Sequence, residues 1–107
     1  MPHREIIVIG GGPAGAAAGI QAARNGINVT VFEKGEHGRD KVCGDGLTPR
    51  AVGALNDLEI DLTDAHKIQG LRMIAGKKVR ELDWPATARF PSHGAVWPRR
   101  RLDTELI

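Results

Sequence analysis

The glycine-rich segment GGGPAG, between an apolar run and an alanine-rich run, constrains the fold more than any other feature of the sequence. Residues 5–9 (EIIVI) are rich in β-branched apolar residues and predict a strand buried on both faces of a parallel sheet. Residues 13–25 predict a helix with Pro13 at its first position, and Gly26 is a suitable C-terminal stop. Residues 27–33 predict a second strand. The sequence therefore predicts one complete β-α-β unit.

Three glycines of the segment have the G-x-G-x-x-G spacing of dinucleotide-binding folds. Gly10 permits the tight turn after the strand, and Gly12 lets a pyrophosphate approach the backbone. Gly15 allows the helix to pack closely on the sheet. This spacing is weak evidence alone, but here a strand precedes it, a helix follows it and Glu33 ends the next strand. The pattern indicates a nucleotide site.

Charge in this region agrees with an anionic ligand. No Asp or Glu occurs between Ile6 and Phe32, and a helix N-terminus carries partial positive charge and unpaired N–H groups. Glu33 is placed to accept hydrogen bonds from a ribose diol, and its carboxylate would repel a 2′-phosphate. The site thus favours FAD or NAD over NADP, and the spacing does not separate FAD from NAD.

The rest of the chain predicts further elements but not a second complete β-α-β unit. Thr48 and Pro49 predict the start of a helix whose apolar face carries Ala51, Val52, Leu55 and Leu58. Residues 71–84 predict a β-hairpin that turns at Gly76-Lys77, residues 94–98 a strand, and Arg101 onward a helix. A doubly wound sheet needs several β-α units. We therefore expect residues 1–107 to be the N-terminal portion of a longer FAD-binding domain.

Composition narrows the function classes. The net charge of +2 over 107 residues, with 4% aromatic residues, gives no case for nucleic-acid binding. One cysteine cannot form an internal disulfide, and the four histidines lack ligand spacing, so we expect no metal site. No stretch approaches the roughly 20 apolar residues of a membrane-spanning helix.

The segment RDKVCGDGLTPR contains the single cysteine and leaves several interpretations open. Cys43 could be a redox thiol, although it lacks a partner cysteine, or a catalytic acid beside a cofactor. It could also be a small residue that packs against the cofactor. Arg39 belongs either to a solvated loop or to a phosphate site, for which a guanidinium is better suited than Lys41.

Several stretches together resemble the FAD-dependent geranylgeranyl reductase family, in particular its actinobacterial type. They are GGGPAGAAAG with VFEK, RDKVCGDGLTPRAV, GLRM, DWP, FPSHG and RRRLDTEL. The glycine loop is shared by many flavoproteins, whereas CGDGLTP is specific to this family. The resemblance implies an α/β fold, the FAD/NAD(P)-binding Rossmann-like β-α-β start of a glutathione-reductase-type flavoprotein, with a helix and β-hairpin insertion.

The resemblance also implies which residues bind FAD. The backbone of residues 12–15 would hold the pyrophosphate, and Glu33 would bind the adenosine ribose. The loop that contains Cys43 would lie against the flavin side, and Arg99 would reach the cofactor from a later helix. The implied cofactor-binding residues are Gly10, Gly12, Pro13, Ala14, Gly15, Glu33, Lys34, Arg39, Cys43, Gly44, Gly46 and Arg99. No catalytic residue is assigned, and Cys43 is the only candidate.

For the whole protein, the resemblance implies an oxidoreductase that reduces C=C double bonds of a geranylgeranyl group or a menaquinone tail. Its partners would be an isoprenoid or prenylquinone lipid and an electron donor for the flavin. It would be cytoplasmic or peripheral on the inner membrane face, and this segment alone would be inactive. Two alternatives are an FAD-dependent monooxygenase of the same superfamily and a non-catalytic nucleotide-binding module.

Overall fold

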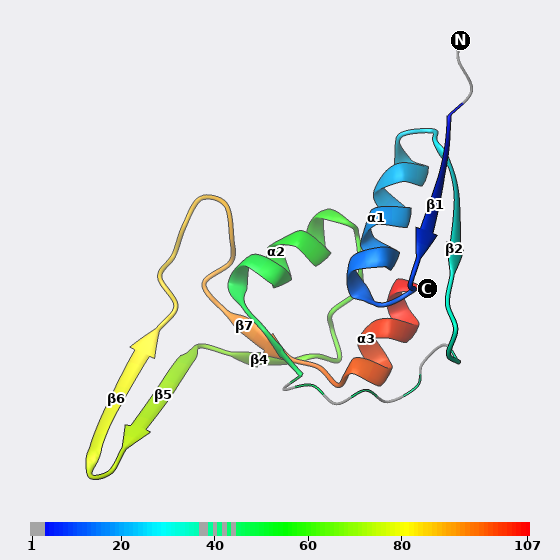
Figure 1. Ribbon diagram of the computed structural model, residues 1–107. Coiled ribbons are helices and arrows are strands. Elements are labelled where there is room, and N and C mark those ends of the chain that lie inside the picture. The colour runs from blue at the N-terminus through cyan, green and yellow to red at the C-terminus, as the bar shows by residue number, and fades with distance from the viewer. Residues whose placement is uncertain (1–3, 37–38, 40, 42, 44) are drawn as a thin grey trace. The chain divides into compact units, whose positions relative to one another are not determined.

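The computed structural model describes residues 4–36, 39, 41, 43 and 45–107, which form two compact units (Figure 1). The first unit comprises residues 1–43 and 98–107, and the second comprises residues 44–97. The second unit contains a helix and a β-hairpin, and in the sequence it lies between the two segments of the first. The predicted insertion is therefore confirmed.

The first unit contains the predicted β-α-β arrangement. Strand β1 (Glu5–Ile9) pairs in parallel with β2 (Asn28–Phe32), and helix α1 (Pro13–Arg24) connects them. Proline stands at the first helical position, and Gly26 follows the helix with a φ of 73°, which is unfavourable for other residues. The predicted start at Pro13 and the stop at Gly26 are confirmed, because each depends on a backbone restriction visible in the sequence, and the helix ends one residue before the predicted end at residue 25.

One face of this two-stranded sheet packs against α1. A Cβ atom built on Gly19 would lie 3.2 Å from Cγ2 of Val31, and one built on Gly15 would lie 3.2 Å from Cγ1 of Val8. Contacts this short mean that α1 lies almost directly on the valines of both strands. The glycines let the helix approach, as the sequence predicted for Gly15.

The opposite face of the sheet differs from the prediction. Ile7, Ile9 and Phe32 are 61%, 82% and 55% exposed, respectively. The expectation that residues 5–9 form a strand buried on both faces is therefore wrong for the described part of the chain. The reason is geometric: alternate side chains point to opposite faces of a strand, and α1 covers only one of these faces.

Helix α3 (Arg99–Leu106) returns the chain to the first unit. It begins two residues before the predicted start at Arg101, with Pro98 at its N-cap. Leu102 and Leu106 are buried, and α3 packs against α1. The burial of these two leucines determines how α3 is oriented about its own axis.

The second unit is built around a three-stranded antiparallel sheet in the order β3 (Gly46–Leu47), β7 (Gly94–Val96) and β4 (His66–Ile68). Helix α2 (Pro49–Asp57) packs against β7, and Thr48 Oγ1 caps it by accepting a 3.2 Å hydrogen bond from the N–H of Ala51. The predicted cap, helix and last strand are confirmed. The buried side chains of this unit are Val52, Leu55, Ala95 and Trp97.

A separate hairpin, β5 (Gly70–Ala75) and β6 (Lys78–Asp83), completes the second unit. It turns at Gly76, whose φ is 61°, as predicted. Its large apolar side chains are exposed: Leu71, Met73, Ile74, Val79 and Leu82. Within the part of the chain that the structure describes, no helix is long and apolar enough to cross a membrane.

Candidate functional site

The glycine loop joins the end of β1 to the start of α1 in a tight turn. Gly10 has a φ of 104°, and its N–H extends the β1–β2 ladder by a 2.7 Å bond to the carbonyl of Phe32. A Cβ on Gly15 would overlap the carbonyl oxygen of Gly10. Gly15 thus makes room for the turn itself as well as for the sheet, a role that the spacing rule alone did not predict.

Glu33 lies at the end of β2 and is held against this loop. Its Oε2 accepts a 2.9 Å hydrogen bond from the N–H of Gly11, and its Oε1 accepts a 3.2 Å bond from the N–H of Gly35. Donation from Gly35 and then from Gly11 lowers the pKa of Glu33 below its ordinary value of 4.5, against a smaller effect of desolvation. The carboxylate is therefore ionised and oriented at neutral pH.

Gly11 is part of the site although it is an unspecified position in the G-x-G-x-x-G pattern. A Cβ at this position would lie 3.2 Å from the Cβ of Glu33. The absence of a side chain lets the acid approach the N–H of Gly11. Reasoning from side chains missed this contact, because the donor is a backbone group.

Arg99 and Asp103 form an ion pair on α3. Arg99 Nε lies 2.8 Å from Asp103 Oδ1, and Nη2 lies 3.1 Å from Oδ2. Their side chains are only 14% and 15% exposed. The Asp103 carboxylate raises the pKa of Arg99 above its ordinary value against desolvation, and the side chain of Cys43 adds a smaller effect. Arg99 is a fixed cation.

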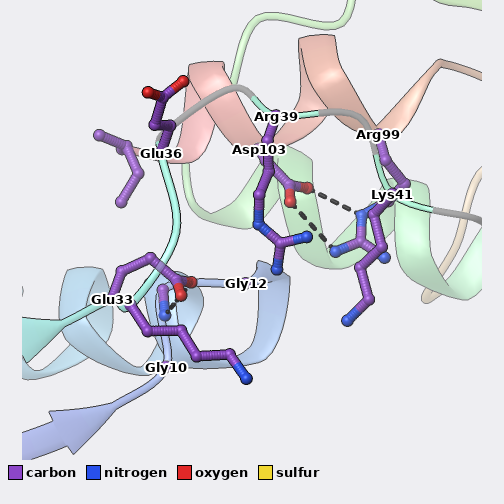
Figure 2. A pocket seen from close by; sticks show the side chains of 11 residues that line it. Gly10, Gly12, Glu33, Glu36, Arg39, Lys41, Arg99 and Asp103 are labelled. Carbon is purple, nitrogen blue, oxygen red and sulfur yellow. Dashed lines mark hydrogen bonds and ion pairs between the residues drawn. The ribbon is translucent and has the colours of Figure 1, made fainter.

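A cavity of about 220 Å³ lies over the glycine loop in the first unit. Figure 2 shows the side chains of Arg39, Lys41 and Arg99 directed toward the space above Gly12, whereas Glu36 points away from the loop. The lining residues are Gly10, Gly11, Gly12, Glu33, Lys34, Glu36, Arg39, Lys41, Arg99, Asp103 and Ile107. Four cationic side chains therefore face one turn of backbone that has no side chains of its own.

The arrangement fits a diphosphate. A Cβ on Gly12 would lie 3.8 Å from Arg99 Nη2, and a side chain there would therefore extend toward the guanidinium. The first helical hydrogen bond is donated by Ala16 to the carbonyl of Gly12, so the N–H groups of Ala14 and Gly15 precede it. A cation that faces the positive end of a helix is repelled by it, and an anion between them removes the repulsion. The cavity has the donors and charge for such an anion.

Arg39 lines the same cavity and lies beside Gly35. Its guanidinium lies over the backbone of Gly35, where a Cβ would be 2.6 Å from Nε. Its charge also contributes to the lowered pKa of Glu33. Arg39 is exposed and lines the cavity, so its assignment to a phosphate site or to a solvated loop stays a prediction.

Cys43 is exposed, and its side chain interacts with the Arg99 guanidinium. The three interpretations for this residue, a redox thiol, a catalytic acid and a small residue that packs against the cofactor, all stay predictions.

The other predicted residues fall in three places. Pro13, Ala14 and Gly15 form the first turn of α1, directly after the loop. Gly44 lies outside the described residues. Gly46 belongs to the second unit, as the first residue of β3.

Asp103, Lys41 and Glu36 line the cavity but were absent from the predicted set. For Asp103 a signal was present, since it lies four residues after Arg99 and i,i+4 pairs meet on one face of a helix. Glu36 and Lys41 lie in an irregular segment, where residue spacing does not determine direction.

Comparison with known proteins gives matches over nearly the whole chain. A family model described as FAD dependent oxidoreductase matches residues 5–89. A menaquinone reductase of Mycobacterium tuberculosis (strain ATCC 25618 / H37Rv) is 44% identical over 95% of the chain, and a digeranylgeranylglycerophospholipid reductase of Thermoplasma volcanium is 30% identical over 99%. The crystal structure of CmlS, a flavin-dependent halogenase, matches 99% of the chain and 20% of its own, with a TM-score of 0.87 and 28% identity.

The chain spans about a quarter of the two reductases, 25% and 27% of their lengths. The matches confirm the resemblance drawn from the motifs and the flavoprotein type of α/β fold. They also confirm FAD, rather than NAD, as the cofactor for which such a chain is built. The individual roles of the site residues stay predictions.

Proposed function

Because the chain belongs to the family of FAD dependent oxidoreductases, we propose that it is the N-terminal, ADP-binding portion of an enzyme that reduces C=C double bonds of an isoprenoid chain. The observation that carries the proposal is the 44% identity to a menaquinone reductase over 95% of the chain. The cavity over the glycine loop supports the cofactor part of the proposal, because it combines an ionised acid with a cation-lined anion site.

Two sets of groups in the cavity would bind two different parts of FAD. The N–H groups at the start of α1 and the Arg99 guanidinium would bind the pyrophosphate, and the Glu33 carboxylate would accept hydrogen bonds from the adenosine ribose. Gly11 and Gly35 would keep Glu33 in place for this role. When reduced and bound, FAD supplies the hydride for one carbon of the double bond, and a proton reaches the other carbon.

A lipid is the substrate class that the relatives support. One relative is named for menaquinone and the other for a digeranylgeranyl glycerophospholipid, and both lipids contain an isoprenoid chain. We propose the same class here, an isoprenoid or prenylquinone lipid, together with an electron donor for the flavin. Such a lipid is confined to a membrane, which supports membrane contact, and we propose that the enzyme is cytoplasmic or peripheral on the inner membrane face.

Mass spectrometry of the prenyl lipids of a strain that lacks the protein tests the substrate class. We expect the quinone or the geranylgeranyl pool to retain double bonds that the parent strain saturates. Unchanged saturation in both pools would contradict the reductase proposal. A strain that carries the restored gene is the control.

An FAD-dependent monooxygenase is the alternative with the same fold, and it has less support because both relatives are named as reductases. Turnover of the full-length protein with and without oxygen separates the two functions. A reductase makes its product without oxygen, whereas a hydroxylated product that requires oxygen would identify a monooxygenase. A non-catalytic nucleotide-binding module would give neither product.

A further inference from the structure

We propose that Asp103 is a positioning residue of the cofactor site, which fixes the Arg99 guanidinium in the orientation that meets the diphosphate. This inference rests on the proposed function, since it assumes that a dinucleotide occupies the cavity over the glycine loop. It adds a residue that the motifs did not assign. Asp103 would act through Arg99, without contact to the cofactor.

The geometry of the pair restricts the guanidinium. The two carboxylate oxygens bind Nε and Nη2, and a two-bond contact of this kind fixes the plane of the group as well as its position. The Nε and Nη2 edge of the guanidinium faces Asp103. In this orientation Nη2 lies 3.8 Å from the position that a Cβ on Gly12 would occupy. The guanidinium thus borders the backbone where the phosphates would lie.

The rotation of α3 brings both members of the pair to the cavity. Leu102 and Leu106 are buried, which turns one side of α3 into the packed interior of the unit. Arg99 and Asp103 share another side of the helix and both line the cavity (Figure 2). The pair is a local i,i+4 contact, so both of its members are supplied by α3 itself.

The Asp103 carboxylate offsets electrostatic repulsion between Arg99 and the other positive groups at the cavity. Arg99 faces the positive end of α1, and Lys34, Arg39 and Lys41 line the same cavity. Without a carboxylate partner, these like charges would favour rotamers of Arg99 that move away from the loop. Glu33 is held by Gly11 and Gly35, and Glu36 points away from the loop. Among the described acids that line the cavity, Asp103 is therefore the one that pairs with Arg99 and offsets this repulsion (Figure 2).

Substitution of Asp103→Asn in the full-length protein tests the inference. We expect the Kd for FAD to rise about tenfold. This is near the middle of the range of interaction free energies for contacting residues in one network. Glu105→Gln is the matched control, because Glu105 is an exposed acid on the same helix and its loss changes the net charge equally. The control should keep its Kd within about twofold of the wild type.

Two further measurements separate positioning from a structural role. Asp103→Asn should weaken binding of ADP to the FAD-free protein but leave adenosine binding unchanged, since only ADP carries the diphosphate. In an Arg99→Gln background, Asp103→Asn should cause no further loss of FAD affinity. Equal losses for ADP and adenosine, or additive losses in the double variant, would overturn the inference. Asp103→Glu keeps a carboxylate and should restore part of the affinity.

The outcomes also separate this inference from the proposed function. If the wild-type protein binds FAD and Asp103→Asn binds it as tightly as Glu105→Gln does, only the role of Asp103 is refuted. If the wild-type protein binds neither FAD nor ADP, the proposed function fails and the inference fails with it. Thermal unfolding of each FAD-free variant shows whether it is folded, and Asp103→Glu supplies the test if Asp103→Asn is not.

Discussion

Glu33 and Arg99 both line the cavity over the glycine loop, and each is held by hydrogen bonds within the first unit. Two backbone amides orient the carboxylate, and one carboxylate orients the guanidinium. The sequence predicted both residues, Glu33 from its position at the end of the second strand and Arg99 from a family resemblance. It did not predict Gly11 or Gly35 as supports, because the groups that hold Glu33 are backbone N–H groups.

The first prediction at this scale concerns the ribose contact. Glu33→Gln keeps the size of the side chain but removes its charge, so it should raise the Kd of the full-length protein for FAD about tenfold or more. Flavin fluorescence titration measures the change. Glu36→Gln is the control, since Glu36 lines the cavity but points away from the loop in Figure 2. Equal affinities for wild type and Glu33→Gln would refute the role of Glu33.

A second prediction follows from the lowered pKa of Glu33. A depressed carboxyl pKa stabilises the folded state at pH values above the ordinary value of 4.5, and this contribution disappears as the pH falls through the folded-state pKa. Glu33→Gln should therefore reduce the free energy of unfolding at neutral pH and flatten its fall below about pH 4.5. Urea unfolding of both proteins between pH 3 and pH 7 checks this; parallel pH profiles would contradict it.

A third prediction concerns Cys43. Cys43→Ser keeps a small side chain that can interact with Arg99, so the Kd for FAD should change by less than about threefold. Turnover is measured separately on the FAD-loaded protein. A large loss of turnover with unchanged affinity would assign the thiol to the chemistry, and a large loss of affinity would contradict the predicted contact role.

At the scale of elements, α1 illustrates how closely a helix can lie on its sheet. The predicted start at Pro13, the stop at Gly26 and the neighbouring strands all agree with the structure, since each follows from a backbone or periodicity rule. The short strands β3 and β4 were not predicted, because two and three residues are too few to show a period. Their pairing with β7 comes from contacts distant in the sequence.

Two glycines of α1 make a matched pair for a test of this packing. Gly15→Ala should destabilise the protein by about 1–3 kcal/mol or more, since the new methyl group would overlap backbone at Gly10. Gly19→Ala should stay within about 1 kcal/mol of the wild type, because the new methyl group meets only the side chains of Val29 and Val31 and the residue gains helix propensity. Urea unfolding measures both, and equal effects would contradict the proposed difference between the two contacts.

At the scale of the whole molecule, the exposed face of the β1–β2 sheet and the length of the relatives both suggest that more chain packs on this sheet. Ile7, Ile9 and Phe32 form an apolar face, and the relatives are about four times longer than the match. We propose that further chain of the full-length protein covers this face. The predicted burial of residues 5–9 would then hold for that protein, although it is wrong for the described residues.

Substitution of Ile7→Ala in the full-length protein tests whether the face is covered. A covered isoleucine should cost about 2–4 kcal/mol of unfolding free energy on truncation. An isoleucine exposed as in the described residues should cost under about 0.5 kcal/mol, and this smaller result would contradict the proposal. Urea unfolding measures the difference.

Anaerobic incubation of the flavin-reduced, full-length protein with a prenylquinone, followed by mass spectrometry of the lipid, tests the proposed function most directly. We expect a product that has gained two hydrogen atoms for each double bond reduced, with one flavin reoxidised for each double bond. A lipid that stays unchanged without oxygen and gains an oxygen atom in its presence would contradict it.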